Sequence, residues 1–184
     1  MPGNAQLPSD TLLRLSPYSL RCEQLAEPRG LNSSHPKFGW ALQGGGQGAV
    51  QRAYEICVGY DQNKVARGEG SHWQSGRIES RIQHFVAYEG KELKSEEVLY
   101  WSVRVWDEND TASDWAQPHK IFTGLMCRKD WEAKWIARYF VLPAGREIPA
   151  DNIYDNQWQA RPADYLRREF NAPTKPLRAT LYVT

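Results

Sequence analysis

Apolar and polar residues alternate with a period of two through most of residues 20 to 125. In KFGWAL (37–42), AYEICVGY (53–60) and YWSVRVW (100–106), every second residue is large and apolar. Successive side chains of a β-strand point to opposite faces, so this pattern is typical of half-buried antiparallel strands. The sequence therefore predicts strands, and not helices, as the building units of this region.

Segments rich in Gly, Asn, Asp and Ser separate the apolar runs and predict turns. They are QGGGQG (43–48), EGSHWQSG (69–76), YEGKEL (88–93) and DENDTASD (107–114). The strands predicted between them lie at 20–25, 36–43, 49–60, 77–88, 97–107 and 118–124, with a short one near Trp73. Short strands at this spacing, without a convincing amphipathic helix, predict an all-β fold, an Ig-like or fibronectin type III-like β-sandwich. Residues 99–106 carry the longest apolar pattern and no proline, which favours a central strand.

The character of the sequence changes after residue 125. In MCRKDWEAKWIA (126–137), Trp131 and Trp135 lie four residues apart, which fits either a helical turn or an extended connector between two domains. Residues 143–163 then hold three prolines and little alternation, and we interpret them as a loop-rich insertion.

Two further strands are predicted at YLRREF (165–170) and LRATLYVT (177–184). Two strands alone do not make an independently stable sheet, so these residues predict the start of a second β-sandwich that is incomplete here. The predicted organisation is an N-terminal extension (1–19), a sandwich (20–125), and a connector with the incomplete second sandwich (126–184).

Composition excludes several classes of function. The charge is nearly balanced, with 23 Lys and Arg against 22 Asp and Glu, which leaves no basic field for nucleic acid. No apolar run approaches the roughly 20 residues that cross a bilayer. The start MPGNAQLPSD has neither a basic nor an apolar signal region, so we expect a cytoplasmic protein that binds no membrane. Cys22, Cys57 and Cys127 are odd in number and widely spaced, which fits no disulfide framework.

One glycine-rich segment resembles a nucleotide-binding loop. GGGQGA (44–49) contains a G-x-G-x-x-A pattern after a predicted strand. A dinucleotide site requires a helix after the glycines, so that the amide dipoles meet the pyrophosphate. The residues that follow are rich in β-branched and aromatic side chains, and we therefore interpret the segment as a hairpin turn.

Other chemical motifs are also incomplete. DENDTASD (107–114) lacks the glycine and glutamate of a calcium loop. The four histidines have no ligand-spaced partners; they are His35, His72, His84 and His119. Glycoside hydrolysis needs two carboxylates, and Glu96–Glu97 or Asp151 with Asp155 offer pairs, but nothing around them predicts a cleft. We predict no catalytic, cofactor-binding or metal-binding residue in this chain.

Tryptophan rings outside the strands could bind a sugar by stacking. Trp73, Trp115 and Trp158 lie in loop-like contexts and are the candidates. A tryptophan at the edge of a sandwich more often packs against its neighbours than against a ligand, so both interpretations stay open.

The order of these segments resembles the N-terminal region of bacterial α-L-rhamnosidases of glycoside hydrolase family 78. The resemblance rests on LRCEQLAEPRGLNSSHPKFGWAL, QGAVQRAYEICVGY, HWQSGRIES, FVAYEGKELKSEEVLYWSVRVWDENDTASDW and FTGLMCRKDWEAKWI. It implies a fibronectin type III-like domain over these segments. LRREFNAPTKPLRATLYVT is similar to the opening of the family's next β-sandwich.

The same resemblance implies where the chemistry of such an enzyme lies. The family's acidic general acid and general base act in an inverting hydrolysis on a downstream (α/α)6 barrel, and no position of this chain corresponds to them. The expected partners are the remaining C-terminal domains of the same polypeptide, and rhamnose-containing glycosides through the full enzyme. Two alternatives are a stand-alone carbohydrate-binding or adhesion module, and a related enzyme that acts on another sugar, because fold does not fix substrate.

Overall fold

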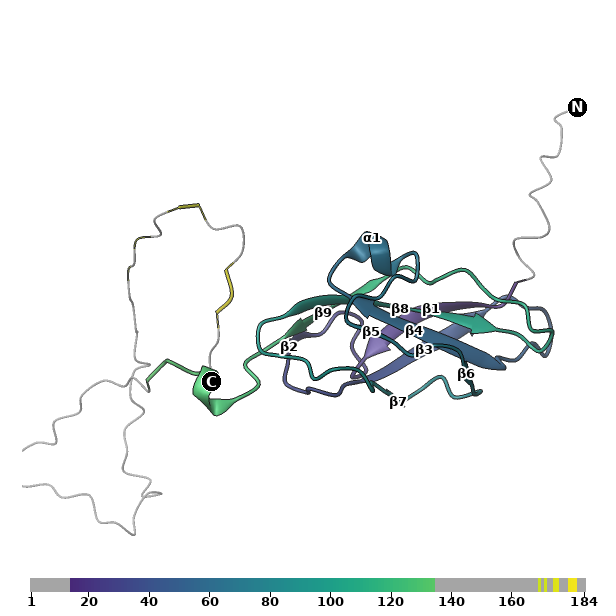
Figure 1. Ribbon diagram of the computed structural model, residues 1–184, viewed down its shortest axis with the longest axis horizontal. Coiled ribbons are helices and arrows are strands. Elements are labelled where there is room, and N and C mark those ends of the chain that lie inside the picture. The colour runs from purple at the N-terminus through teal and green to yellow at the C-terminus, as the bar shows by residue number, and fades with distance from the viewer. Residues whose placement is uncertain (1–13, 135–168, 170, 172–173, 176–178, 182–184) are drawn as a thin grey trace, which may run out of the picture. The chain divides into compact units, whose positions relative to one another are not determined.

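A computed structural model describes residues 14–134, together with 169, 171, 174–175 and 179–181. The chain divides into two units, 1–132 and 133–184. The regular elements that the structure describes all lie in the first unit (Figure 1). They are β1 (Ser16–Cys22), β2 (Arg29–Leu31), β3 (Lys37–Gln43), β4 (Ala53–Gly59), α1 (Gln62–Val65), β5 (Trp73–Gln74), β6 (Ile78–Glu79), β7 (Val86–Ala87), β8 (Val98–Trp106), β9 (His119–Thr123) and the 3-10 turn η1 (Arg128–Asp130).

The strands form two sheets that pack face to face (Figure 1). The smaller sheet has the order β1-β3-β7, and the larger has the order β2-β9-β8-β4-β5, with β6 also paired to β4. Every pairing is antiparallel except that of β2 with β9. The prediction of an all-β, Ig-like sandwich is confirmed.

Strand β8 lies in the middle of the larger sheet, between β4 and β9. Its register with β4 is continuous from Gly59 opposite Tyr100 to Ala53 opposite Trp106. The apolar pattern at 99–106 therefore correctly predicted a central strand.

Large aromatic residues form the core between the sheets. Phe38 and Trp40 of β3 meet Trp101 of β8, and the rings of Phe38 and Trp101 stack with centroids 4.2 Å apart. The indole N–H of Trp40 donates a hydrogen bond of 2.9 Å to the buried Gln51 side chain. The predicted alternation is confirmed, because Ile56 and Val58 face the same core.

The sequence predicted a hairpin turn at the glycine-rich segment 44–48, and this prediction is wrong. It connects β3 of the smaller sheet to β4 of the larger one, so the chain crosses between layers here. Its four glycines have φ between 77° and 84°, the left-handed region that favours glycine. Periodicity shows which side chains face the core but does not show to which sheet a strand belongs, and this explains the error. The loop leads into β4 and not into a helix.

The predicted strand 77–88 is also wrong as a single element. Its first part, β6, pairs with β4, and its last part, β7, pairs with β3 of the other sheet. The side-chain amide of Gln51 donates to the carbonyls of Ser80 and Ile82, which fixes the chain where it passes from one sheet to the other. Strand β1 begins earlier than the predicted 20–25, and β2 has no counterpart among the predicted strands.

A single-turn helix, α1, was not predicted. Asp61 caps its first turn by accepting hydrogen bonds from the amides of Asn63 (2.8 Å) and Lys64 (3.1 Å). Val65 at its end is fully buried over Gly59 of β4, where an added Cβ would lie 3.1 Å from a Val65 methyl. One turn is too short to show a helical period, so only the capping aspartate marked it.

The predicted second sandwich lies almost entirely outside the described residues. Both of its proposed strands, 165–170 and 177–184, fall mainly there. Among the positions that are described beyond residue 134, no helix or strand is assigned. The start of a second β-sandwich therefore stays a prediction.

Candidate functional site

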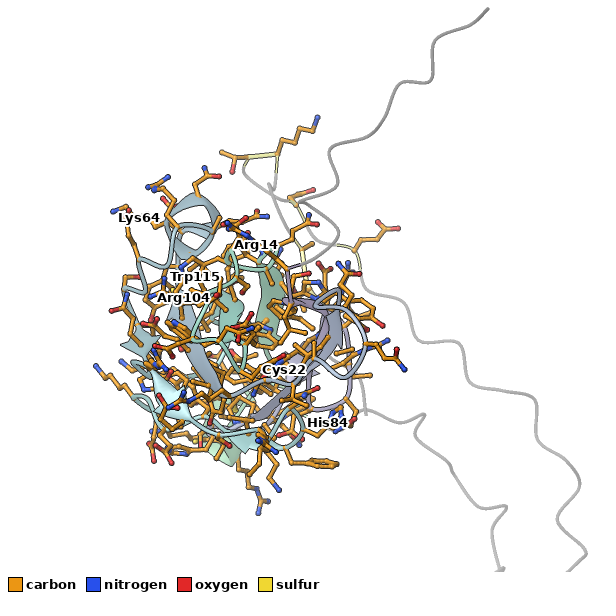
Figure 2. All side chains as sticks on the ribbon, turned by 90° about the vertical axis from the view of Figure 1, so that its right-hand side faces the viewer. Arg14, Cys22, Lys64, His84, Arg104 and Trp115 are labelled. Atoms are coloured by element: carbon orange, nitrogen blue, oxygen red, sulfur yellow. The ribbon has the colours of Figure 1, made fainter. Side chains whose placement is uncertain are left out.

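Arginine and tryptophan side chains alternate on the outer face of the larger sheet. The guanidinium groups of Arg77 and Arg104 each lie 4.8 Å from the ring centre of Trp106. Arg104 also lies 5.0 Å from the ring centre of Trp115. Figure 2 shows Arg104 and Trp115 together, on the same flank of the sandwich as Lys64 of α1. The order of this stack is therefore Arg77, Trp106, Arg104 and Trp115.

Carboxylates hold the two arginines of the stack in place. Glu55 of β4 pairs with Arg104 at 2.7 Å, across the register of β4 and β8. Arg77 pairs with Glu79 at 2.8 Å and also with Asp110. The hydrogen bond from Arg77 lowers the pKa of Asp110 below its ordinary value. The charged groups of this face are thus paired with one another.

Trp115, a predicted sugar-stacking residue, belongs to this stack. Arg104 covers part of its ring, and a Cβ added at Gly68 would lie 2.4 Å from its indole nitrogen. Gly68 has φ of 80°, and this backbone geometry brings the chain against the indole. The indole of Trp115 therefore makes contacts within the domain, and its role in stacking a sugar stays a prediction.

Trp73, the second predicted stacking residue, lies in a different cluster. Its ring meets that of Tyr88 edge-on, with centroids 4.9 Å apart, and packs against the core. Trp73 and Trp115 make their ring contacts with different residues, so the structure does not join them in one stacking surface. Trp158, the third candidate, lies outside the described residues.

Tyr60 and His72, which the sequence analysis did not select, lie beside Trp73 in a hydrogen-bonded network. The Tyr60 hydroxyl donates to Glu97 at 3.0 Å and lies 3.1 Å from His72 Nδ1. His72 Nε2 lies 3.1 Å from the carbonyl of Lys91, and because a carbonyl only accepts, Nε2 carries a proton. Partial burial, followed by the bond to Glu97, raises the pKa of Tyr60, so the phenol stays protonated at neutral pH. Tyr60 continues the alternating run of β4, and this was its only signal in the sequence.

A groove of about 580 Å³ lies where the chain leaves β9. One wall is the loop before β8 and the other is the segment that leads into η1. The lining residues are Lys91, Glu92, Leu93, Lys94, Ser95, Met126, Cys127, Lys129 and Asp130. The hydrogen bond from Ser95, and then the amide of Cys127, lower the pKa of Asp130.

The pKa shifts of the carboxyl groups bear on whether one of them could act as the general acid in glycoside hydrolysis. A glycosidase general acid needs a carboxyl group whose pKa is raised, so that it is protonated near neutral pH. Asp110 and Asp130 are the carboxyl groups with shifted pKa values in the described part of the chain, and both shifts are downward. Within the same residues no cluster of three or more His, Cys, Asp or Glu side chains could hold a metal ion.

No helix among the described residues is long and apolar enough to span a membrane.

Comparison with known proteins identifies the family. Residues 17–127 match the model of the Rha78A-like, N-terminal immunoglobulin domain. An α-L-rhamnosidase of Formosa agariphila is 38% identical over 112 residues, which are 60% of this chain and 12% of that protein. An α-L-rhamnosidase of Alteromonas sp. strain LOR is 32% identical over 170 residues, which are 91% of this chain and 18% of that protein.

A solved structure shows the same fold. The Streptomyces avermitilis α-L-rhamnosidase, crystallised with L-rhamnose, superposes with a TM-score of 0.64 at 35% identity. The match covers 67% of this chain but only 12% of that enzyme. The chain thus spans less than a fifth of the relatives it matches. It belongs to the family of Rha78A-like N-terminal immunoglobulin domains.

Proposed function

We propose that this chain is the non-catalytic N-terminal β-sandwich region of an α-L-rhamnosidase-like hydrolase. Its role is to position the rest of the polypeptide, which carries the (α/α)6 catalytic domain that removes terminal α-L-rhamnose from rhamnosides. The proposal draws on relatives that are α-L-rhamnosidases and extend far beyond the matched region. The division into 1–19, 20–125 and 126–184, with a second sandwich starting in the last part, belongs to this proposal.

One observation carries the non-catalytic assignment. The charged groups of the stack on the larger sheet are paired with one another, as in the pairs of Arg104 with Glu55 and Arg77 with Asp110. Catalytic acids and bases need pKa values near the working pH. The lowered pKa of Asp130 makes its carboxyl group unsuitable as a general acid, although it lines the groove beside η1.

The direct test is hydrolysis of an aryl α-L-rhamnoside. The 184-residue chain should release no aryl alcohol above the uncatalysed rate, whereas the Alteromonas relative serves as the positive control. Hydrolysis by this chain, abolished by Asp130→Asn, would contradict the non-catalytic assignment.

A second candidate function is a carbohydrate-binding module. The observation that favours it is the ring of Tyr60, which is 50% exposed and lies against His72. The positioning role predicts no saturable binding when the chain is titrated with L-rhamnose in a calorimeter. Millimolar or tighter binding that Tyr60→Ala and Trp73→Ala abolish, and that the exposed control Phe85→Ala retains, would favour the binding module instead.

A further inference from the structure

Beyond Gly124, side chains of Ser95 and Asp130 hold the segment through which the chain leaves the sandwich. We propose that Ser95 and Asp130 form a clasp that fixes the direction in which the polypeptide leaves β9. This inference rests on the proposed positioning function and names the residues that carry it out.

The base of the clasp is Thr123, the last residue of β9. Its buried hydroxyl accepts from the amide of Glu97 at 2.8 Å and donates to the carbonyl of Lys94 at 2.6 Å. The amide of Thr123 donates in turn to the carbonyl of Glu97 at 3.0 Å. Loop 94–97 is thereby fixed against the end of β9.

The clasp itself is formed by Ser95 and by residues that follow Thr123 along the chain. The hydroxyl of Ser95 accepts a hydrogen bond of 2.8 Å from the amide of Met126. Its own proton is then directed to Asp130 Oδ2, and the same oxygen accepts from the amide of Cys127 at 3.1 Å. Ser95 therefore ties the exit segment to loop 94–97 at Met126 and at Asp130, and the bond from Cys127 to Asp130 braces the exit segment itself.

The direction of each hydrogen bond in the clasp suits an ionised aspartate at this position. An amide N–H can only donate, so the Met126 amide makes the Ser95 oxygen an acceptor and leaves its single proton for Asp130. Asp130 Oδ2 accepts from both the hydroxyl and the Cys127 amide, and the negative charge of a carboxylate strengthens both bonds. The lowered pKa of Asp130 keeps it charged.

The backbone of loop 94–97 is strained at Glu96, and this strain accompanies a hydrogen bond to the exit segment. Glu96 has φ of 61°, a left-handed conformation that is unfavourable for a non-glycine residue. In this conformation its amide donates to the carbonyl of Gly124 at 3.2 Å. Strain of this kind persists where surrounding contacts hold it, and here those contacts are the hydrogen bonds of the exit segment.

The test measures how narrowly the exit direction is defined. In the full 184-residue chain, Cys127→Ser removes the exposed thiol, and spin labels are attached at Lys64→Cys on α1 and Glu132→Cys after η1. Burial raises the pKa of Cys22 and Cys57 to about 12, so these thiols stay unlabelled. Pulsed electron paramagnetic resonance then gives the distribution of distances between the labels.

The labelled background should give one narrow distribution, and Ser95→Ala or Asp130→Ala, each of which removes the side-chain atoms of the clasp, should broaden it about twofold, because the exit segment then samples more conformations. Asp114→Asn, an exposed aspartate on another loop, is the matched control and should leave the width unchanged. Thermal melting should stay within a few degrees in each variant, so a change in width reports orientation and not unfolding.

Unchanged widths in both clasp variants would overturn the inference. If a variant unfolds at a lower temperature, the milder variant Asp130→Glu is used instead, and hydrogen exchange of the Met126 and Cys127 amides is measured. Amide protection equal to that of the parent would also overturn the clasp. Failure of the proposed function is separate, because rhamnoside hydrolysis or sugar binding by the chain would refute positioning while leaving the distance distributions as they are.

Discussion

The two faces of the larger sheet are both buried, but by different means. On the inner face, Ile56, Val58 and Trp101 pack against the smaller sheet. On the outer face, Cys57 and Ser102 are equally inaccessible, although no second sheet covers them there. Their cover is α1 together with the loop that carries Trp115 and the stack of tryptophan and arginine side chains.

Because both faces of the larger sheet are buried, the apolar alternation of β4 does not separate a buried face from a solvated one. A period of two predicts one buried and one solvated face, yet β4 is buried at nearly every position, although the described residues place a sheet against only one of its faces. Small or polar residues such as Cys57 and Ser102 mark the second face because a one-turn helix and flat side chains cover it closely. Ser102 donates to the carbonyl of Ala116, so its polar group is satisfied beneath this cover.

The inner face should show the largest response to substitution. Trp101→Ala removes a fully buried ring that stacks on Phe38, and we expect a loss of about 3–5 kcal/mol of unfolding free energy. Urea unfolding followed by tryptophan fluorescence measures it. The outer-face match, Trp115→Ala, should cost less than half as much, and equal losses would remove the distinction between the faces.

Trp101 offers a second comparison at the same site. Its indole N–H is buried and has no hydrogen-bond partner in the described part of the chain. Trp101→Phe keeps an aromatic ring against Phe38 and removes this unpaired donor. We therefore expect it to cost less than about 2 kcal/mol, and a loss as large as that of the alanine variant would show that the retained ring volume does not stabilise this site.

The outer stack should depend on the planar guanidinium of Arg104. Arg104→Ala removes the pair with Glu55 and the contact with two indoles, and we expect a loss of about 2 kcal/mol. Arg104→Lys keeps the charge but not the flat group, and should recover about half of that loss. A double-mutant cycle with Glu55→Gln separates the ion pair from the stacking. A lysine variant as stable as the parent would show that stacking contributes nothing.

The helix α1 should protect the outer face locally. Asp61→Ala removes the cap of α1 and should cost about 1 kcal/mol. Because α1 packs over β4, a thiol reagent should then modify Cys57 about fivefold faster, while Cys22 in the inner core keeps its rate. Gln62→Ala, at an exposed position of the same helix, is the control. If Cys57 and Cys22 were both modified faster by the same factor, the inner and outer faces of the sheet would open together.

The smallest effect concerns pH at the edge of the stack. The hydrogen bond from Arg77 lowers the pKa of Asp110 in the folded state below the ordinary 3.8. Its contribution is therefore present above the unfolded-state pKa and is lost as pH falls through the lower folded-state pKa. The urea midpoints of the parent and Asp110→Asn should differ at pH 6 and converge towards pH 2. In an Arg77→Gln background, the difference between the two urea midpoints should no longer depend on pH. If the dependence persists, a group other than Arg77 lowers the pKa of Asp110.

Sequence periodicity could find the candidate groups only in part. Trp73 and Trp115 were selected because their sequence contexts are loop-like, but Trp73 belongs to β5, and the contacts with Tyr88 and Arg104 come from residues distant in sequence. Tyr60 was visible only as part of an alternating strand, and its link to Glu97 spans 37 residues. The Ser95–Asp130 pair spans 35 residues and carries no local motif. Such contacts follow from the path of the chain and not from any local pattern.

The sequence by itself determined the β-class, the central position of residues 99–106, and the inward faces of β3, β4 and β8. These follow from alternation, because the direction of successive side chains in a strand is a local property. Only the tertiary structure decided that 44–48 crosses between sheets, that 77–88 divides between them, and that Ser95 meets Asp130. Sheet membership and long-range polar pairing depend on which backbone groups find partners in three dimensions, and no local pattern specifies that choice.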